Sequence, residues 1–194
     1  MIGLAKTWQS RSIRTFFLIF SLFQLAACKI DSQELFVRAA KEGQIEAVKG
    51  PLSRGANPNH RKGGWTMLMI VAKEGHIDVA KVLLEYGADV NARDTKGNQT
   101  GGSMALSIAS EHGHVDMVKL LLAHGAEVNA KNNHGSSALM YASEFEHPNV
   151  AKILIDAGAD ITIKDKDGET AFMIAKRKGN SEILKLIQDP EAKE

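Results

Sequence analysis

The chain has 194 residues, of which 44% are hydrophobic and 24% charged, a composition ordinary for one globular domain or at most two. The formal net charge is +1, which removes bulk positive charge as a reason to expect nucleic-acid binding. The single cysteine excludes an intrachain disulfide scaffold.

Residues 1–27 are typical of a targeting segment. Lys6, Arg11 and Arg14 precede an apolar run at residues 16–27. A run of 12 residues is too short to cross a hydrocarbon layer, which takes about 20, and the small residues at its end favour a secretory signal peptide. Removal of this segment leaves 21 basic and 23 acidic residues.

The segment ends in Leu25-Ala26-Ala27-Cys28, which resembles the lipobox of bacterial lipoproteins. The resemblance implies cleavage before Cys28 and a lipid thioether on its sulfur. Several acyl chains together would hold the chain firmly on a membrane. By resemblance to bacterial sorting rules, Lys29 favours the outer membrane, with the protein facing the periplasm. The alternatives are an ordinary signal peptide with a chance cysteine, and an uncleaved anchor.

One stretch recurs along the rest of the chain. Residues 75–92 read GHIDVAKVLLEYGADVNA and residues 113–130 read GHVDMVKLLLAHGAEVNA, and weaker copies begin near residues 43, 147 and 179. The landmarks of the five copies lie 32, 38, 33 and 33 residues apart; they are Gly43, Gly75, Gly113, Glu146 and Gly179. This spacing is close to the period of about 33 residues in ankyrin repeats. The chain resembles the ankyrin-repeat family from roughly Asp31 to Gln188.

The resemblance implies an all-α solenoid of about five repeats, each made of two antiparallel helices and a β-hairpin-like tip. Stacked neighbours then bury the apolar faces that one repeat cannot bury alone. A tether at residues 28–31 reaches roughly 13 Å when extended, which keeps the repeats close to the membrane surface. We place the repeats at residues 32–61, 62–93, 94–131, 132–164 and 165–188, with a polar tail at 189–194.

The inner helix of each repeat is clearest after Thr66, which is placed to cap it. The segment matches the family's T-P-L-H-x-A-A signature at Thr66, Leu68 and Ala72, with Met67 and Met69 in place of proline and histidine. Related blocks stand at residues 104–110, 137–143 and 170–176. Their fixed distance from the following turn supports the assignment.

Two departures from the pattern are predicted to disturb helices. Gly75, Gly113 and Gly179 occupy a turn that favours positive φ, but Glu146 stands there in the fourth repeat and should be strained. In the first repeat, Gly50-Pro51 falls within the outer helix, where proline costs about 3 kcal/mol. We therefore expect that helix to be broken or short.

The interval between the second and third repeats is five residues too long, and the excess lies at residues 98–103. One interpretation is a tolerated insertion, because lengthening a surface loop costs little. The other is an enlarged finger on the binding side, where loops tend to carry function.

The sequence gives little support to a metal site or to catalysis. His76, His114 and His147 each follow the inter-helix turn, where the resemblance implies a structural histidine. The remaining histidines are dispersed on loops and helix ends; they are His60, His112, His124 and His134. No zinc-ligand spacing, G-x-S-x-G motif or P-loop occurs, so we expect no enzyme, no metal and no cofactor.

Methionines recur on the predicted inner helices, at residues 67, 69, 104, 140 and 173. Core filling is the simpler interpretation, because methionine adapts to irregular gaps. The alternative is that some of them line the binding groove as an adaptable contact surface.

The resemblance places partner contacts on the concave face formed by the tips and the ends of the inner helices. Carried over position by position, the contact residues are Trp65, Lys73, Glu74, Thr95, Lys96, Glu111, His112, Asn133, His134, Ser136, Glu144, Phe145, Lys166, Asp167, Glu169, Arg177 and Lys178. Exposed Trp65 and Phe145 are the expected anchors, because binding hot spots favour large aromatic side chains. The alternative for Trp65 is packing against the neighbouring tip.

These features predict a non-catalytic protein-binding module, monomeric and held by lipid on Cys28 in the bacterial cell envelope. It would bind a protein partner, and no nucleic acid, in the groove. One alternative is an envelope immunity or stress-protection protein that inhibits a toxin or lytic enzyme. That alternative rests on fold-level analogy. A second alternative is a metal-binding or small-molecule-binding protein.

Overall fold

The computed structural model describes residues 32–95 and 101–187. The chain divides into two compact units, residues 1–38 and 39–194. In the first unit, the described residues 32–38 form the beginning of helix α2 (Ser32–Lys41). Several predictions lie outside the described residues; they concern the signal segment, Cys28, the tether, Lys96, residues 98–100 of the extension, and the tail.

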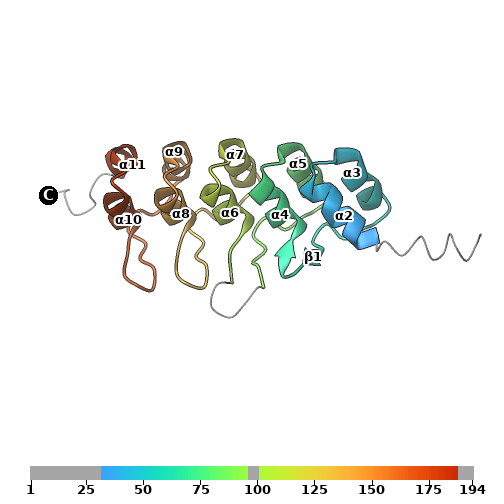
Figure 1. The fold of residues 1–194 in the computed structure, drawn as a ribbon, viewed down its shortest axis with the longest axis horizontal. Coiled ribbons are helices and arrows are strands. Elements are labelled where there is room, and N and C mark those ends of the chain that lie inside the picture. The colour runs from blue at the N-terminus through green and yellow to red at the C-terminus, as the bar shows by residue number, and fades with distance from the viewer. Residues whose placement is uncertain (1–31, 96–100, 188–194) are drawn as a thin grey trace, which may run out of the picture. The chain divides into compact units, whose positions relative to one another are not determined.

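The second unit is built from helix pairs in two layers (Figure 1). The inner helices are α4 (Met67–Glu74), α6 (Ala105–Glu111), α8 (Ala138–Glu144) and α10 (Ala171–Lys178). The outer helices are α3 (Ile45–Ser53), α5 (Ile77–Glu85), α7 (Val115–Ala123), α9 (Pro148–Asp156) and α11 (Ser181–Leu186). Inner helices contact inner neighbours, outer helices contact outer neighbours, and each inner helix contacts its own outer helix. The predicted all-α solenoid is confirmed.

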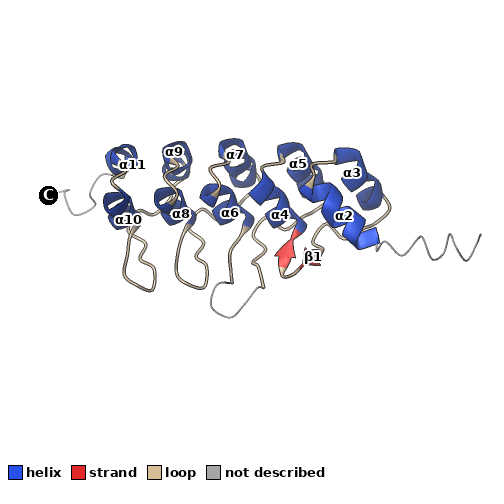
Figure 2. Cartoon of the chain, in the orientation of Figure 1, coloured by secondary structure: helices blue, strands red, loops and turns tan. Residues whose placement is uncertain are grey.

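Loops joining an outer helix to the next inner helix form the tips, all on one side of the pairs (Figure 2). The first tip is a short antiparallel hairpin of β1 (Arg61–Lys62) and β2 (Trp65–Thr66). Arg61 pairs with Thr66 and Lys62 with Trp65, so Gly63 and Gly64 form a two-residue turn. Both glycines have positive φ, as such a turn requires.

The helices of the second unit have only six to nine residues each. Because isolated helices shorter than about 12 residues are marginal in water, packing between the helices must stabilise them. Leu68, Leu106 and Leu139 repeat on the inner helices and are at most 2% exposed. Burial of each leucine contributes about 2 kcal/mol. The core therefore lies between the layers and between successive pairs.

Methionines help to begin two inner helices. The Thr66 hydroxyl accepts a hydrogen bond from the Met69 amide, 3.2 Å away, and the Thr66 amide donates back to the Met69 sulfur at 3.4 Å. Ser137 and Met140 repeat the arrangement. The substitution of methionine for the family's histidine therefore leaves a reciprocal cap in place. The predicted cap at Thr66 is confirmed.

The prediction that Gly50-Pro51 breaks or shortens the first outer helix is wrong. Helix α3 runs unbroken over nine residues, the same length as α5. Pro51 lacks the donor that would bond back to the Ala47 carbonyl, so the helix loses one backbone bond at this place. The Ser53 hydroxyl donates to the Gly50 oxygen at 2.9 Å, and Leu52 is 3% exposed. Local bonds and burial thus offset the missing donor.

Glu146 has a φ of 60°, at the place where Gly113 has 70°. The predicted departure from ordinary backbone geometry is confirmed. Pro148 begins α9 two residues later, at a position where its missing amide hydrogen costs nothing.

Four of the five inner-helix methionines are buried, namely Met67, Met69, Met104 and Met140. Core filling is confirmed for these four. Met173 is 48% exposed, because α10 is the last inner helix of the described residues and no further helix covers it.

Asparagine side chains connect successive helix pairs through the loops that follow the outer helices. The Asn91 side chain donates to the Gly125 oxygen at 3.0 Å and accepts from the Glu127 amide at 2.9 Å. Asn59 and Asn129 make the same two bonds one repeat before and one repeat after. Each link spans neighbouring repeats only.

Within residues 32–95 and 101–187, the structure contains no helix with the length and apolar character needed to cross a membrane.

Candidate functional site

The inner helices and tips expose one row of residue pairs, which we call the inner-helix face. Each pair joins the residue before the N-terminal cap of an inner helix to a residue near the end of that helix. From repeat to repeat the pairs are Trp65 and Lys73, Ser103 and Glu111, Ser136 and Glu144, and Glu169 and Arg177. Their charge and size change at every step apart from the two Ser–Glu pairs in the middle.

Backbone hydrogen bonds join successive tips. The Thr95 amide donates to the Gly64 oxygen at 3.1 Å, the Asn133 amide to Gly101 at 3.0 Å, and the Lys166 amide to His134 at 2.9 Å. These bonds hold the tips as one continuous edge. The predicted contact residues on this edge have exposed side chains; they are Thr95, Asn133, His134, Lys166 and Asp167.

Asp94 closes the base of the long tip. Its amide donates to the Ser103 oxygen at 2.8 Å, and its carboxylate accepts from the Gly102 amide at 2.7 Å. Gly101 and Gly102 are buried, and a Cβ at Gly102 would lie 2.6 Å from the Asn133 side chain. The extension therefore leaves the contact with the next tip unchanged.

Trp65 differs from the exposed anchor that the sequence predicted. Its ring is partly buried against the cluster of Met69, Ala92 and Ile108, which comes from its own repeat and the next one. The Lys73 ammonium lies 5.9 Å from the ring centroid, in range of a cation–π contact. Trp65 is thus partly exposed, and its packing partners include Met69 on α4 and Ile108 on α6 rather than the neighbouring tip alone.

Phe145 is 46% exposed at the end of α8. The equivalent places in the other repeats carry polar residues, namely Glu74, His112 and Lys178. All four residues end their inner helices, opposite the tips. Of the two predicted aromatic anchors, Phe145 is the more exposed, and these four positions extend the inner-helix face to the helix ends.

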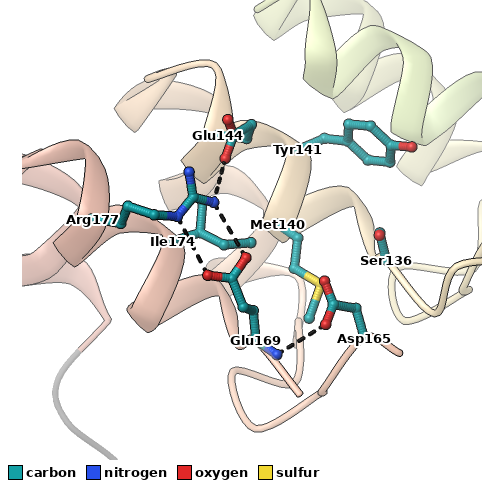
Figure 3. A pocket seen from close by; sticks show the side chains of 8 residues that line it. All are labelled: Ser136, Met140, Tyr141, Glu144, Asp165, Glu169, Ile174 and Arg177. Carbon is teal, nitrogen blue, oxygen red and sulfur yellow. Dashed lines mark hydrogen bonds and ion pairs between the residues drawn. The ribbon is translucent and has the colours of Figure 1, made fainter. Parts of the chain in front are cut away.

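Ion pairs cluster between the fourth and fifth repeats (Figure 3). Arg177 contacts Glu144 at 2.9 Å and Glu169 at 3.2 Å, and Lys178 contacts Glu144 at 2.8 Å. Arg177 thereby links α8, α10 and the last tip. These side chains are about one third to one half exposed, so solvent screens the pairs and weakens them.

Beside this cluster lies a pocket of about 160 Å³. It contains four residues predicted from the sequence, Ser136, Glu144, Glu169 and Arg177. The structure adds four others: Met140, Tyr141, Asp165 and Ile174. Figure 3 shows the two faces of the pocket, with Tyr141 and Ser136 on one side and Ile174 and Arg177 on the other.

Neighbouring groups shift the pKa values of two residues that line the pocket, Glu144 and Tyr141. Hydrogen bonding to Lys178, and then to Arg177, lowers the pKa of the Glu144 carboxyl below its ordinary value. Burial raises the pKa of the Tyr141 hydroxyl, and the negative charges of Glu111 and Asp94 raise it further. Hydrogen bonds with Ser103 and Asn132 act in the opposite direction, but the pKa stays above its ordinary value. Near neutral pH, Glu144 is therefore ionised and Tyr141 is neutral.

Tyr141 and Asp165 were missed at the sequence level, although each carries a signal. Tyr141 occupies the place of Ile70, Ile108 and Ile174 in the inner-helix blocks, so a side chain with a hydroxyl group replaces an aliphatic one there. Asp165 accepts from the Asp167 and Glu169 amides, as Asn132 does one repeat earlier for His134 and Ser136. A recurrent Asp or Asn before a tip is a turn signal.

The three repeated histidines are structural, as the resemblance implied. His76, His114 and His147 each reach the main chain of the preceding repeat at 2.9–3.0 Å. In the portion of the chain that the structure describes, no group of three or more His, Cys, Asp or Glu residues is placed to hold a metal ion.

A family model described as ankyrin repeats, in three copies, matches residues 16–94 and 94–165 of the chain. The two matched ranges cover more than half of its length. A search of curated proteins gives no match.

Proposed function

The chain belongs to the ankyrin-repeat family, and we propose that this protein–protein interaction module is lipid-anchored in the bacterial cell envelope and binds its partner through the inner-helix face. The repeat array implies the interaction module. The anchor, the compartment and the choice of face are the proposed parts.

The choice of face is supported by a difference between residues that repeat along the array and residues that vary. The histidines and asparagines that join the repeats make the same contacts each time, so they serve the scaffold. The paired positions of the inner-helix face change from Trp65 and Lys73 to Glu169 and Arg177 while the backbone beneath them repeats. Residues that vary on a constant frame are free to specify a partner.

Crosslinking in intact cells tests this face. Phe145→Ala and Glu111→Lys together should abolish crosslinks to a protein partner captured by the wild type, because they remove an aromatic contact and invert a charge. Matched changes on the outer layer, Tyr86→Ala and Glu85→Lys, should leave the crosslinks intact; Tyr86 is 37% exposed. Crosslinks that survive Phe145→Ala with Glu111→Lys would reject the face.

The lipobox Leu25–Cys28 supports the anchor. Each buried CH₂ contributes about 0.8 kcal/mol, so several acyl chains on Cys28 suffice without a membrane-spanning helix. Cys28→Ala should yield an uncleaved chain without N-terminal acylation, observed by mass spectrometry and membrane fractionation. An acylated wild-type N-terminus at another residue would contradict the proposal. So would a wild-type chain cleaved without lipid.

A further inference from the structure

The pocket between the fourth and fifth repeats combines an apolar floor with acidic walls. Met140 and Ile174 are at most 5% exposed and form the apolar part, together with the ring of Tyr141. Glu144, Asp165 and Glu169 supply three carboxylates. The pocket has a volume of about 160 Å³ and opens on the inner-helix face.

Most of the charged groups around the pocket are already engaged. Both Glu169 oxygens accept hydrogen bonds from Arg177, and the two Glu144 oxygens contact Arg177 and Lys178. Both cations therefore already contact carboxylates of this cluster, which offset their charge. The three carboxylates exceed the two cations by one negative charge.

Asp165 has an uncommitted oxygen. Its Oδ1 atom accepts from the Asp167 amide at 3.0 Å and from the Glu169 amide at 2.9 Å. Among the described residues, its Oδ2 atom has no hydrogen-bond or ion-pair partner. In Figure 3 the Asp165 side chain lies at the pocket beside Ser136 and Met140.

We infer that this pocket receives a lysine or arginine side chain of the bound partner. The aliphatic stem would lie on Met140 and Ile174, and the cation would bond to Asp165. An acidic side chain would meet the excess negative charge. A purely apolar side chain would strip water from the Asp165 carboxylate without replacing its hydrogen bonds, which is costly. The inference rests on the proposed function, since it assigns the partner's chemistry at the same face.

Methionine methyl signals allow a direct test on the full chain. The protein is labelled with ¹³C at its methionine methyl groups, and the Met140 signal is assigned by its loss in Met140→Leu. The probe is acetyl-Gly-Arg-Gly-amide, and its neutral control replaces arginine by citrulline, which has nearly the same shape. We expect the arginine peptide to shift the Met140 signal saturably, in the millimolar range. The buried Met69 and Met117 signals should stay unchanged.

Asp165→Asn is the matched variant, because Asn132 accepts the same pair of turn bonds with an amide oxygen. The tip should keep its conformation while the pocket loses one charge. We expect the arginine peptide to bind about fivefold more weakly, as for a partly exposed charge pair. An equal response to arginine and citrulline would overturn the inference. An unchanged affinity in Asp165→Asn would also overturn it.

The two proposals fail separately. If Phe145→Ala with Glu111→Lys abolishes partner crosslinks but the arginine peptide does not shift the Met140 signal, the pocket assignment is wrong and the proposed binding face is retained. If the Met140 signal responds as expected but crosslinks survive the inner-face changes, the pocket binds cations and the partner contacts another surface.

Discussion

The Nε2 atom of His114 lies 2.9 Å from the main-chain oxygen of Lys73, which belongs to the preceding repeat. Because a carbonyl only accepts, Nε2 must carry the hydrogen. The same ring covers Gly75, where a Cβ would approach within 2.9 Å. His147 repeats both contacts with Glu111 and Gly113. A bond and a close approach thus fasten each repeat to the one before it.

His114→Ala should lower the free energy of unfolding by about 1–2 kcal/mol, through loss of one hydrogen bond and of the ring's packing. Urea unfolding followed by circular dichroism measures the change. His124→Ala is the control, since His124 is exposed at the end of α7. Equal effects of the two substitutions would contradict the role assigned to His114.

Gly113→Ala should destabilise the chain more than Gly179→Ala does. Both glycines have φ near 70°, so alanine costs about 1–2 kcal/mol at either position. At Gly113 the new Cβ would also meet the His147 ring at 2.7 Å, whereas at Gly179 nothing lies within 4 Å. The difference between the two midpoints in urea isolates the histidine contact. A larger loss at Gly179 would refute this account.

Glu146→Gly should stabilise the chain by about 0.5–1 kcal/mol. Glycine removes the cost of a φ of 60°, and part of the gain is offset by the greater freedom of glycine in the unfolded chain. Glu146→Ala keeps the positive φ and should change the melting temperature little. Stabilisation by alanine as large as that by glycine would point to the loss of charge as the cause.

Glu144→Gln should weaken the fall in the free energy of unfolding as the pH is lowered. Because the folded-state pKa of Glu144 is lowered, its stabilising contribution is complete above the unfolded-state pKa of about 4.3. The contribution is lost as pH falls through the lower folded-state value. Solvent exposure keeps it below about 1 kcal/mol. Unfolding measured between about pH 3 and 6 should show a weaker pH dependence in the variant than in the wild type, and identical slopes would contradict the assignment.

The periodic parts of the fold were predictable from the sequence, because a repeated pattern reports both the helices and their stacking. Thr66, the histidines after the turns and Glu146 each stand at a fixed place in the period. The prediction for Pro51 was wrong because it counted the missing backbone donor and not the tertiary packing, which buries Val48 and Leu52 on either side of the proline.

The candidate site was predicted less completely. The period indicated which positions face outward, and this brought Ser136, Glu144, Glu169 and Arg177 to the same pocket. Trp65 was misplaced because part of its cover, Ile108, comes from the next repeat. The free oxygen of Asp165 follows from the turn geometry, which residue types alone do not reveal. The lipid anchor on Cys28 stays a prediction.

The bonds of Asp94 to Ser103 and Gly102 have a practical consequence for engineering. They join the two sides of the long tip at its base, so the spacing of the helix pairs does not depend on the length of the segment between them. The polypeptide between residues 95 and 101 is accordingly the place to insert an epitope or a fluorescent reporter.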